Sequence, residues 1–376
     1  MKYYIIAGER SGDLHASNLV RALLRLRPAT RFRGFGGDAM KEAGVEVVIH
    51  YDRLAFMGFE AVLNFYKIAR YMAACKRDIR AYAPDALILV DYGGFNRQMA
   101  TFGKKHEIPV FYYIPPKVWA WRQSRAWQLK RTVTRMFVIL PFEKDFFGKY
   151  DMPVAYVGNP VLDAIRAFQP DPFFGEKVPI PNGRPLVALL PGSRKMELQR
   201  MVPLMAEVAK KYPDVHFGVA AVRNLPSTLY APLHGNANVF FVFDATYDLL
   251  TRAHAAIVTS GTATLETALF KVPQVVVYKA GWIEYAIARR VVKVPFISLV
   301  NLIAGKLVVQ ELIQDQADAH HVGHELGQLL AAGNYRDKMK DAYNELYDTL
   351  NVGSASENTA RLIEDYWRNR EGATPL

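Results

Sequence analysis

The chain lacks several of the residues and patterns from which common sites are built. It has one cysteine, Cys75, among 376 residues, which excludes an intramolecular disulfide and any metal site that needs several cysteines. It has no Asp-x-Asp pair, and we expect no metal centre. No Gly-x-Gly-x-x-Gly motif follows the first apolar run, which argues against a dinucleotide-dependent oxidoreductase.

Long apolar runs are also missing. No stretch reaches the ~18 consecutive apolar residues of a membrane-spanning helix, and the apolar start at 3–7 meets Glu9 too early for a signal peptide. We therefore expect a cytoplasmic protein, which could still lie on a membrane face. The 47 Lys and Arg residues exceed the 36 Asp and Glu residues, so the net charge is +11. This charge favours an anionic partner, which could be nucleic acid, a phosphorylated substrate or an acidic bilayer.

Strand-like and helix-like patterns alternate along the chain, which predicts an α/β fold with parallel sheets covered by helices. Apolar runs predict strands at 3–7, 86–90, 108–114, 186–190, 215–221, 255–259 and 274–278. A proline-rich stretch at 169–185 separates two halves of this kind. We expect one Rossmann-like domain at 1–168, a second at 169–345, and a helical tail at 346–376 that packs on the first domain or on a partner.

Two glycine turns in the second half each follow an apolar strand and begin a helix. In the first turn, Ser193 and Arg194 follow Gly192, and backbone N–H groups at such a helix start can hold phosphate. The alternative is a plain strand–helix turn with a solvated arginine. The second turn runs over 259–266, and its Glu266 could accept hydrogen bonds from ribose hydroxyls or could cap its own helix.

An acid stands at the end of a predicted strand in the first half. Asp91 follows the apolar run 86–90 and precedes two glycines, Gly93 and Gly94. Ligands of open α/β sheets bind beyond the carboxyl ends of the strands, so Asp91 is placed for general-base work. A turn-forming aspartate is the competing interpretation.

Two further stretches suit an interface. Residues 117–135 carry six cations, no acid, and three of the five tryptophans: Trp119, Trp121 and Trp127. This mixture suits nucleobase stacking, an anionic membrane interface, or a solvated helix face with tryptophan beneath it. Residues 54–72 are dense in large apolar side chains, which suits either core or a surface that receives acyl chains.

Taken together, these stretches resemble one family, lipid-A-disaccharide synthase, an inverting glycosyltransferase of two-domain GT-B architecture. The resemblance runs from about residue 3 to residue 314, and its motifs occur in the family's order. The motifs are AGERSGD (7–13), FRGFGG (32–37), MGF (57–59), PD (84–85), Asp91 with FN (95–96), PKVWAWR (116–122), LPFE (140–143), LPGSR (190–194), TSGTATLE (259–266), and 298–302 with Glu311 and Gln314.

The resemblance implies a fold and a reaction. The fold is two Rossmann-like domains that face each other across a cleft. The enzyme transfers the sugar of UDP-2,3-diacylglucosamine to 2,3-diacylglucosamine 1-phosphate, which gives lipid A disaccharide 1-phosphate and UDP. It works in Gram-negative bacteria as a peripheral protein on the cytoplasmic face of the inner membrane, with an anionic surface as partner and no nucleic acid. No cofactor and no metal are expected, because the UDP-sugar is a substrate, and a homodimer is left open.

The resemblance also implies site residues. The catalytic group is Asp91 as base, with Glu9 and Asn96. The donor site is formed by Gly192, Ser193, Arg194, Ser260, Gly261, Thr262, Thr264, Glu266, Asn301, Glu311 and Gln314. Contacts with the acceptor, its acyl chains or the membrane are expected from Ser11, Met57, Phe59, Val62, Leu63, Tyr66, Trp119, Trp121, Arg122 and Arg125.

Four positions depart from the family pattern: Arg10, Gly94, Pro115 and Asn159. Because Gly94 stands where a second acid is common, Asp91 must act alone or with Glu9 or Asp13. Two other functions compete with the main interpretation. One is another GT-B enzyme that uses a UDP-sugar, either a glycan transferase or a UDP-GlcNAc epimerase. The other is a non-catalytic protein that binds nucleic acid or a membrane surface.

Overall fold

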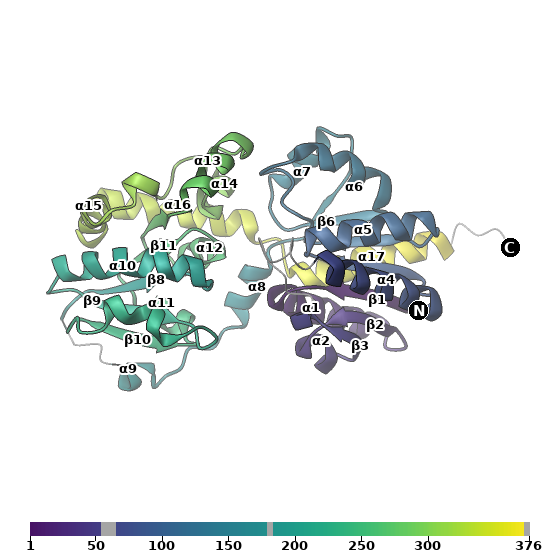
Figure 1. Cartoon of the computed structure of the whole chain (residues 1–376), viewed down its shortest axis with the longest axis horizontal. Helices are drawn as coiled ribbons and strands as arrows, with labels where there is room; N and C mark the ends of the chain where they lie inside the picture. Colours follow the sequence, from purple (N-terminus) through teal and green to yellow (C-terminus); the bar gives the residue numbers. More distant parts are fainter. Residues whose placement is uncertain (54–64, 179–182, 372–376) are drawn as a thin grey trace. The chain divides into compact units, whose positions relative to one another are not determined.

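The structure is a computed structural model that describes residues 1–53, 65–178 and 183–371. The chain forms two compact units (Figure 1). Unit 1 comprises 1–160 and 352–376, and unit 2 comprises 161–351. Unit 1 is therefore built from both ends of the chain, and the proline-rich stretch 169–185 lies inside unit 2.

Unit 1 contains a parallel sheet in the order β3-β2-β1-β4-β5-β6-β7 within the described residues. Its strands are β1 (Lys2–Ala7), β2 (Arg31–Gly36), β3 (Val45–His50), β4 (Ala86–Val90), β5 (Val110–Tyr113), β6 (Arg135–Val138) and β7 (Ala155–Tyr156). Its helices include α1 (Arg10–Leu26), α2 (Asp38–Glu42), α4 (Phe65–Tyr82), α5 (Gly93–Lys105), α6 (Ala126–Thr132), α7 (Glu143–Gly148) and α17 (Ala355–Glu371). Strands β4 and β5 are buried along their whole length, as expected for parallel strands covered on both faces.

The order of strands reverses between β1 and β4, since the chain moves outward from β1 to β3 and then returns to β4 on the other side. Their pairing is in register, with Ala7 opposite Val90, so the two strands end side by side. This order is that of a Rossmann fold, and the reversal is the point at which such folds bind ligands. The loops that follow Ala7 and Val90 are therefore the candidate site of unit 1.

Helix α17 belongs to unit 1 although it lies at the far end of the chain. It packs against α1, and its Ala355, Ala360 and Ile363 are fully buried in the core that contains β1 and β4. The ring of Tyr366 meets that of Phe111 on β5 edge to face, with 5.1 Å between centroids. The yellow helix beside the purple and blue elements in Figure 1 is this segment.

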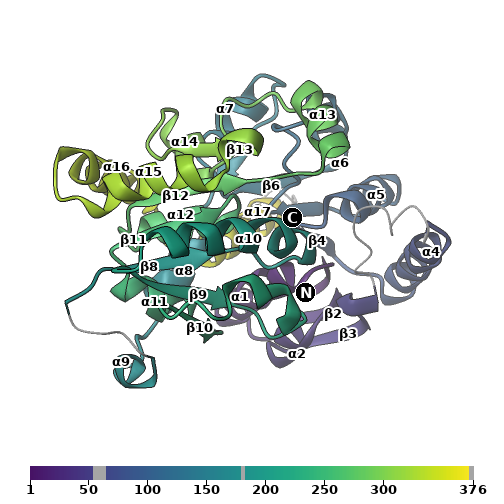
Figure 2. The same ribbon diagram turned by 60° about the vertical axis from the view of Figure 1, so that its left-hand side comes forward.

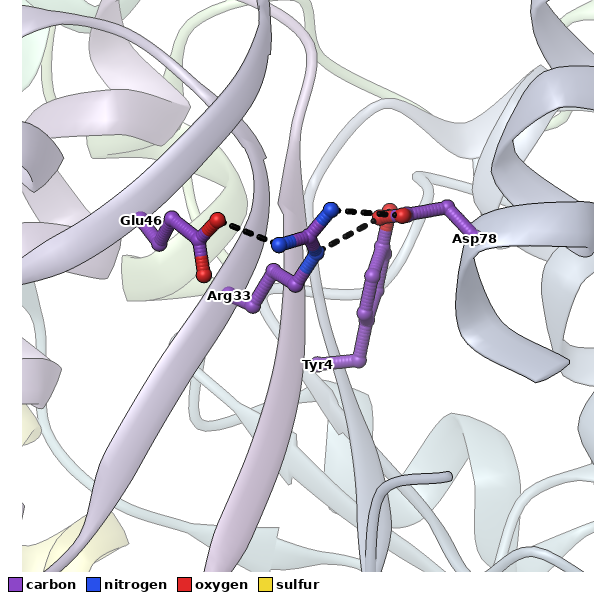
Figure 3. A network of polar contacts seen from close by, with 4 residues as sticks. All are labelled: Tyr4, Arg33, Glu46 and Asp78. Atoms are coloured by element: carbon purple, nitrogen blue, oxygen red, sulfur yellow. Dashed lines mark hydrogen bonds and ion pairs between the residues drawn. The ribbon is translucent and has the colours of Figure 1, made fainter. Parts of the chain in front are cut away.

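Helix α4 is tied to the sheet by one polar network (Figure 3). Asp78 of α4 accepts hydrogen bonds from Tyr4 Oη at 2.8 Å and from Arg33 Nε and Nη2 at 3.0 and 2.8 Å. Arg33 also pairs with Glu46 of β3. A bidentate guanidinium–carboxylate pair of this kind is among the strong hydrogen-bonded contacts of proteins. The network therefore joins α4 to β1, β2 and β3.

Unit 2 contains a second parallel sheet, in the order β10-β9-β8-β11-β12-β13 within the described residues (Figure 2). Its strands are β8 (Leu186–Leu190), β9 (His216–Ala221), β10 (Val239–Phe243), β11 (Ala255–Thr259), β12 (Gln274–Tyr278) and β13 (Glu311–Ile313). Its helices are α8 (Pro160–Ala167, of which Pro160 is counted with unit 1), α9 (Phe174–Lys177), α10 (Lys195–Lys211), α11 (Thr246–Arg252), α12 (Thr262–Leu269), α13 (Trp282–Val291), α14 (Leu299–Ala304), α15 (Ala319–Leu330) and α16 (Asn334–Leu350). The order of strands reverses between β8 and β11, so the loops after these strands are the candidate site of unit 2.

The predicted fold class, α/β with two Rossmann-like domains, is confirmed. The predicted strands 86–90, 186–190, 255–259 and 274–278 agree with the structure residue for residue. Strand β2 was not predicted, because its sequence RFRGFG alternates charge and glycine with aromatic residues. No helix in the described ranges is both long and apolar enough to cross a membrane.

We expect Asp78→Asn to lower the free energy of unfolding of unit 1 by about 1–3 kcal/mol. The substitution removes the negative charge from a half-buried ion pair in which Arg33 donates two hydrogen bonds to Asp78. Urea unfolding followed by tryptophan fluorescence measures this, since Trp119, Trp121, Trp127 and Trp367 all lie in unit 1.

The matched control is Arg25→Gln, which breaks the exposed pair between Arg25 and Glu357. We expect this variant to lose less than about 1 kcal/mol. Equal losses in the two variants would contradict the proposed importance of the Asp78 network.

Candidate functional site

The end of β4 holds Asp91 in an unusual backbone conformation. Asp91 and Tyr92 both have φ of +49°, in the left-handed region that non-glycine residues rarely adopt. The Asp91 carbonyl accepts hydrogen bonds from Asn96 Nδ2 at 2.9 Å and from Tyr112 Oη at 3.0 Å. These bonds hold the strained turn, and strain of this kind is concentrated at functional sites.

The Asp91 side chain is half-buried at this turn. Burial raises the pKa of Asp91 above its ordinary value, while the positive charge of Lys117 and a hydrogen bond from the Tyr92 backbone act in the opposite direction. A carboxylate with a raised pKa is a better proton acceptor than an ordinary aspartate. A carboxylate in this position can accept a proton from a bound hydroxyl group.

Asn96 lies behind this turn and is fully buried. Its amide nitrogen donates to the carbonyls of Ile6, Val90 and Asp91, at 3.3, 3.1 and 2.9 Å. The structure therefore places Asn96 where it positions the ends of β1 and β4, with no exposed surface through which it could touch a substrate.

Glu9 and Ser11 lie at the end of β1. Glu9 is the N-cap residue of α1 and Ser11 is exposed in its first turn. Burial, together with the negative charge of Glu9, raises the pKa of Tyr92, so Glu9 lies close to the Asp91 turn. A Cβ at Gly8 would lie 2.3 Å from the Tyr92 ring, which explains why glycine stands between strand and helix.

Asp13 is not available to assist Asp91. Its carboxylate accepts hydrogen bonds from the backbone N–H groups of Gly37, Ala39 and Met40, at 2.6, 3.0 and 3.2 Å. These are the free donors at the start of α2. Asp13 therefore caps a neighbouring helix.

The tryptophans of residues 117–135 are placed differently from one another. Trp119 is buried, and its Nε1 donates to Glu143 at 3.0 Å, so it packs inside unit 1 and offers no surface to acyl chains or membrane. Trp121 and Trp127 are exposed by 44% and 48%. Arg122 and Arg125 both lie over the Trp121 ring. On α4, Tyr66 is exposed.

In unit 2, the first glycine turn satisfies its own donors. The N–H groups of Ser193 and Arg194 both donate to Glu197 Oε2, at 3.0 and 3.2 Å. Gly192 has φ of +104°, and a Cβ there would lie 2.3 Å from the Glu197 carboxylate. The side chains of Ser193 and Arg194 remain exposed at the carboxyl edge of the sheet.

The second glycine turn places Glu266 beside Tyr247. Tyr247 Oη donates to Glu266 Oε1 at 2.9 Å, and burial raises the pKa of Glu266. Thr264 is buried and donates to the Gly261 carbonyl at 2.8 Å, so it stabilises the turn itself. The turn exposes Gly261 and Thr262, and Ser260 Oγ donates to the Ile297 carbonyl at 3.0 Å.

Asn301, Glu311 and Gln314 fix the loops beside this turn. Glu311 accepts hydrogen bonds from the N–H groups of residues 297 and 298 and from Asn301 Nδ2, at 2.9, 2.9 and 2.8 Å. Asn301 Oδ1 accepts from Val308 and Val309 at 2.8 and 3.0 Å, and Gln314 Oε1 accepts from Ala280 N at 2.6 Å. The side chains of all three thus form hydrogen bonds with backbone groups of unit 2.

Sequence reasoning missed two carboxylate contacts. Glu197 follows Arg194 at the spacing of a capping box, but the N-cap residue is an arginine where the sequence pattern has Ser or Thr. Tyr247 carries no such signal, because it lies 19 residues before Glu266 and meets it only through the fold.

Of the acceptor-side candidates, Met57, Phe59, Val62 and Leu63 lie outside the described residues. Within the described residues, no group of three or more His, Cys, Asp and Glu could hold a metal ion.

Two Rossmann-like sheets with loops at both reversals define a class of proteins that includes sugar-nucleotide enzymes. Among solved structures, the chain is similar to a calicheamicin glycosyltransferase, with TM-score 0.64, 16% identity, and coverage of 100% of this chain and 99% of that one. It is also similar to the UDP-GlcNAc 2-epimerase of Neisseria meningitidis, with TM-score 0.63, 14% identity, and coverage of 98% and 100%. These likenesses show the fold.

The family follows from the sequence comparisons. The model of the lipid-A-disaccharide synthetase family matches residues 3–363. The lipid-A-disaccharide synthase of Geobacter sulfurreducens is 37% identical over 371 residues, which cover 96% of this chain and 95% of that protein. The chain belongs to the lipid-A-disaccharide synthase family, whose members are glycosyltransferases. The predicted family and enzyme class are confirmed.

We expect the stability of unit 1 to depend on pH through the buried acid Glu143. Burial raises the pKa of Glu143 to about 7 from its ordinary 4.5, against hydrogen bonds from Leu140, Trp119 and Ile139. Because the pKa of Glu143 is higher in the folded state than in the unfolded state, protonated Glu143 stabilises the folded state. This stabilisation is fully present below pH 4.5 and is lost as the pH rises through about 7. Relative to Glu143→Gln, the wild type should lose roughly 2–3 kcal/mol over that interval.

Urea unfolding at several pH values measures this difference, with Glu42→Gln on the exposed surface of α2 as control. If Glu143→Gln and the wild type show the same pH slope, the carboxyl group of Glu143 does not titrate as expected.

Proposed function

We propose that this chain joins UDP-2,3-diacylglucosamine to 2,3-diacylglucosamine 1-phosphate, with inversion at the anomeric carbon, and releases UDP. The observation that carries the proposal is the family match over 3–363 together with a half-buried Asp91 at the strand reversal of unit 1. The fold alone would support any sugar-nucleotide enzyme of this class.

In the proposed reaction, Asp91 accepts the proton of the acceptor's 6-hydroxyl group. The oxygen forms a bond to the anomeric carbon while the bond from that carbon to the diphosphate breaks, and UDP leaves with the electron pair. Lys117 and the Tyr92 backbone stabilise the Asp91 carboxylate before the transfer. Glu9, close to Tyr92, keeps a second negative charge near this turn.

Unit 2 would bind the donor at the loops after β8 and β11. Ser193, Arg194 and the start of α12 supply hydroxyl, guanidinium and amide donors for the diphosphate. Because Glu197 accepts from the Ser193 and Arg194 amides, the diphosphate must displace that carboxylate to reach them. Glu266, held by Tyr247, would accept from the ribose hydroxyls. These groups would stabilise the leaving group without a metal or a cofactor.

The test is mass spectrometry of the products formed from the diacylated donor and its 1-phosphate acceptor. The wild type should form the disaccharide 1-phosphate and UDP. Asp91→Asn should lower turnover ~10²–10⁴-fold, because it removes the base, and should leave UDP affinity nearly unchanged.

Asp145→Asn is the control, since Asp145 is an exposed carboxylate of α7. Near-normal turnover by Asp91→Asn would eliminate Asp91 as the base. Conversion of UDP-GlcNAc without any acceptor would instead identify an epimerase.

We also propose a peripheral association with the anionic inner membrane, on the cytoplasmic side. The net charge of +11 and the exposed Trp121 and Trp127, each beside a cation, support it. The protein should sediment with phosphatidylglycerol vesicles at low salt and be released at high salt, and Trp127→Ala should weaken the binding. Phosphatidylcholine vesicles are the control, and a protein that stays in solution at low salt would refute the association.

A further inference from the structure

Three arginines of unit 1 lie on α5 and on the short segment that precedes α6. Arg122 and Arg125 lie over the Trp121 ring, with guanidinium carbons 4.8 and 5.5 Å from its centroid. The third is Arg97, on α5. Burial lowers the pKa of Arg125, and the positive charges of Arg97 and Arg122 lower it further, so both of these guanidiniums lie close to that of Arg125.

The packing of α5 against α6 explains how Arg97 reaches this group. Thr101 lies four residues after Arg97 and therefore on the same face of α5. Thr101 Oγ1 accepts a hydrogen bond from Gln128 Nε2 of α6 at 3.2 Å. Gln128 lies three residues after Arg125. The hydrogen bond between Thr101 and Gln128 therefore brings together the face of α5 that carries Arg97 and the start of α6 beside Arg125.

This cluster of Arg97, Arg122 and Arg125 forms no ion pair with a carboxylate in the part of the chain that the structure describes. The neighbouring Lys130 differs in this respect: it lies over Trp127 at 5.4 Å and pairs with Asp151 at 3.8 Å. Arg122 also has φ of +52°, a strained conformation for a side-chain-bearing residue. Three unpaired guanidiniums with strain at one of them indicate a site for an anion.

The cluster is within electrostatic reach of the base. Burial raises the pKa of Tyr112. The negative charge of Asp91 raises this pKa further, and the positive charge of Arg97 lowers it, so Asp91 and Arg97 both lie near the Tyr112 hydroxyl. Tyr112 Oη in turn donates to the Asp91 carbonyl. Arg97 is therefore the member of the cluster that lies nearest the Asp91 turn in these contacts.

We propose that three arginines bind the phosphate monoester of the acceptor and thereby position its 6-hydroxyl group at Asp91. They are Arg97 and the two that lie over Trp121, Arg122 and Arg125. This inference rests on the proposed function, in which the acceptor's charged group is its 1-phosphate. Planar guanidiniums bind phosphate bidentately, and stacking on Trp121 holds two of them in a fixed orientation.

The experiment compares two variants, Arg122→Gln and Arg125→Gln, with two acceptors, one with the 1-phosphate and one without it. Each variant should raise KM for the phosphorylated acceptor ~10–100-fold, as expected for loss of a charge-assisted contact. For the acceptor without phosphate, KM should be the same in variants and wild type. KM for the UDP-sugar should not change, and Arg125→Lys should recover part of the loss.

Lys130→Gln is the matched control, because it removes a cation that lies over a tryptophan but is already paired. It should leave both acceptor constants unchanged. If the arginine variants raise KM equally for both acceptors, or for neither, the assignment of phosphate to this cluster is wrong.

Two other outcomes separate this inference from its alternatives. If the wild type consumes no donor with the acceptor, the proposed function itself fails. If the variants lose binding to phosphatidylglycerol vesicles while acceptor KM in detergent micelles is unchanged, the cluster binds lipid headgroups and the inference is overturned.

Discussion

The side-chain amide of Asn96 is the contact on which the unit 1 site depends. It donates hydrogen bonds to the carbonyls of Ile6 near the end of β1, of Val90 at the end of β4, and of Asp91, so one buried group joins the two strands at the point where their order reverses. Two consecutive residues can remain in the left-handed region there because this contact and the Tyr112 hydroxyl compensate for the strain. The direction of the Asp91 side chain follows from that backbone, as does the start of α5 with Arg97.

Much of the fold was predictable, because buried parallel strands are short apolar runs that end at glycine, proline or acid. The run 86–90 followed by Asp91 identified both the strand and the carboxylate beyond it. The partners of the polar side chains were not predictable. Asp13 caps a helix that begins at residue 38, and Trp119 turns inward to Glu143 although its neighbour Trp121 is exposed. Such choices depend on contacts between segments distant in sequence.

The two sheets share a strand order, but the groups proposed to bind anions differ in whether they already have partners. In unit 2, carboxylates of the same unit occupy the backbone donors at the carboxyl edge, with Glu197 on the first turn and Glu311 on the loop at residues 297 and 298. A ligand at the first turn therefore exchanges one set of hydrogen bonds for another, and the net free energy is the difference between them. In unit 1 the cations beside Trp121 have no such internal partner among the described residues, so an anion there would displace none.

The placement of α17 has a consequence for how the protein is made. This helix supplies buried residues to unit 1, yet it is the last element of the chain. During synthesis, the whole of unit 2 is translated before the helix that completes the core of unit 1. Unit 2 is one continuous segment and can fold first, whereas the earlier-made strands must wait, with apolar surface uncovered, for residues 355–371. Loss of that terminal helix would thus damage the half of the protein that was translated first.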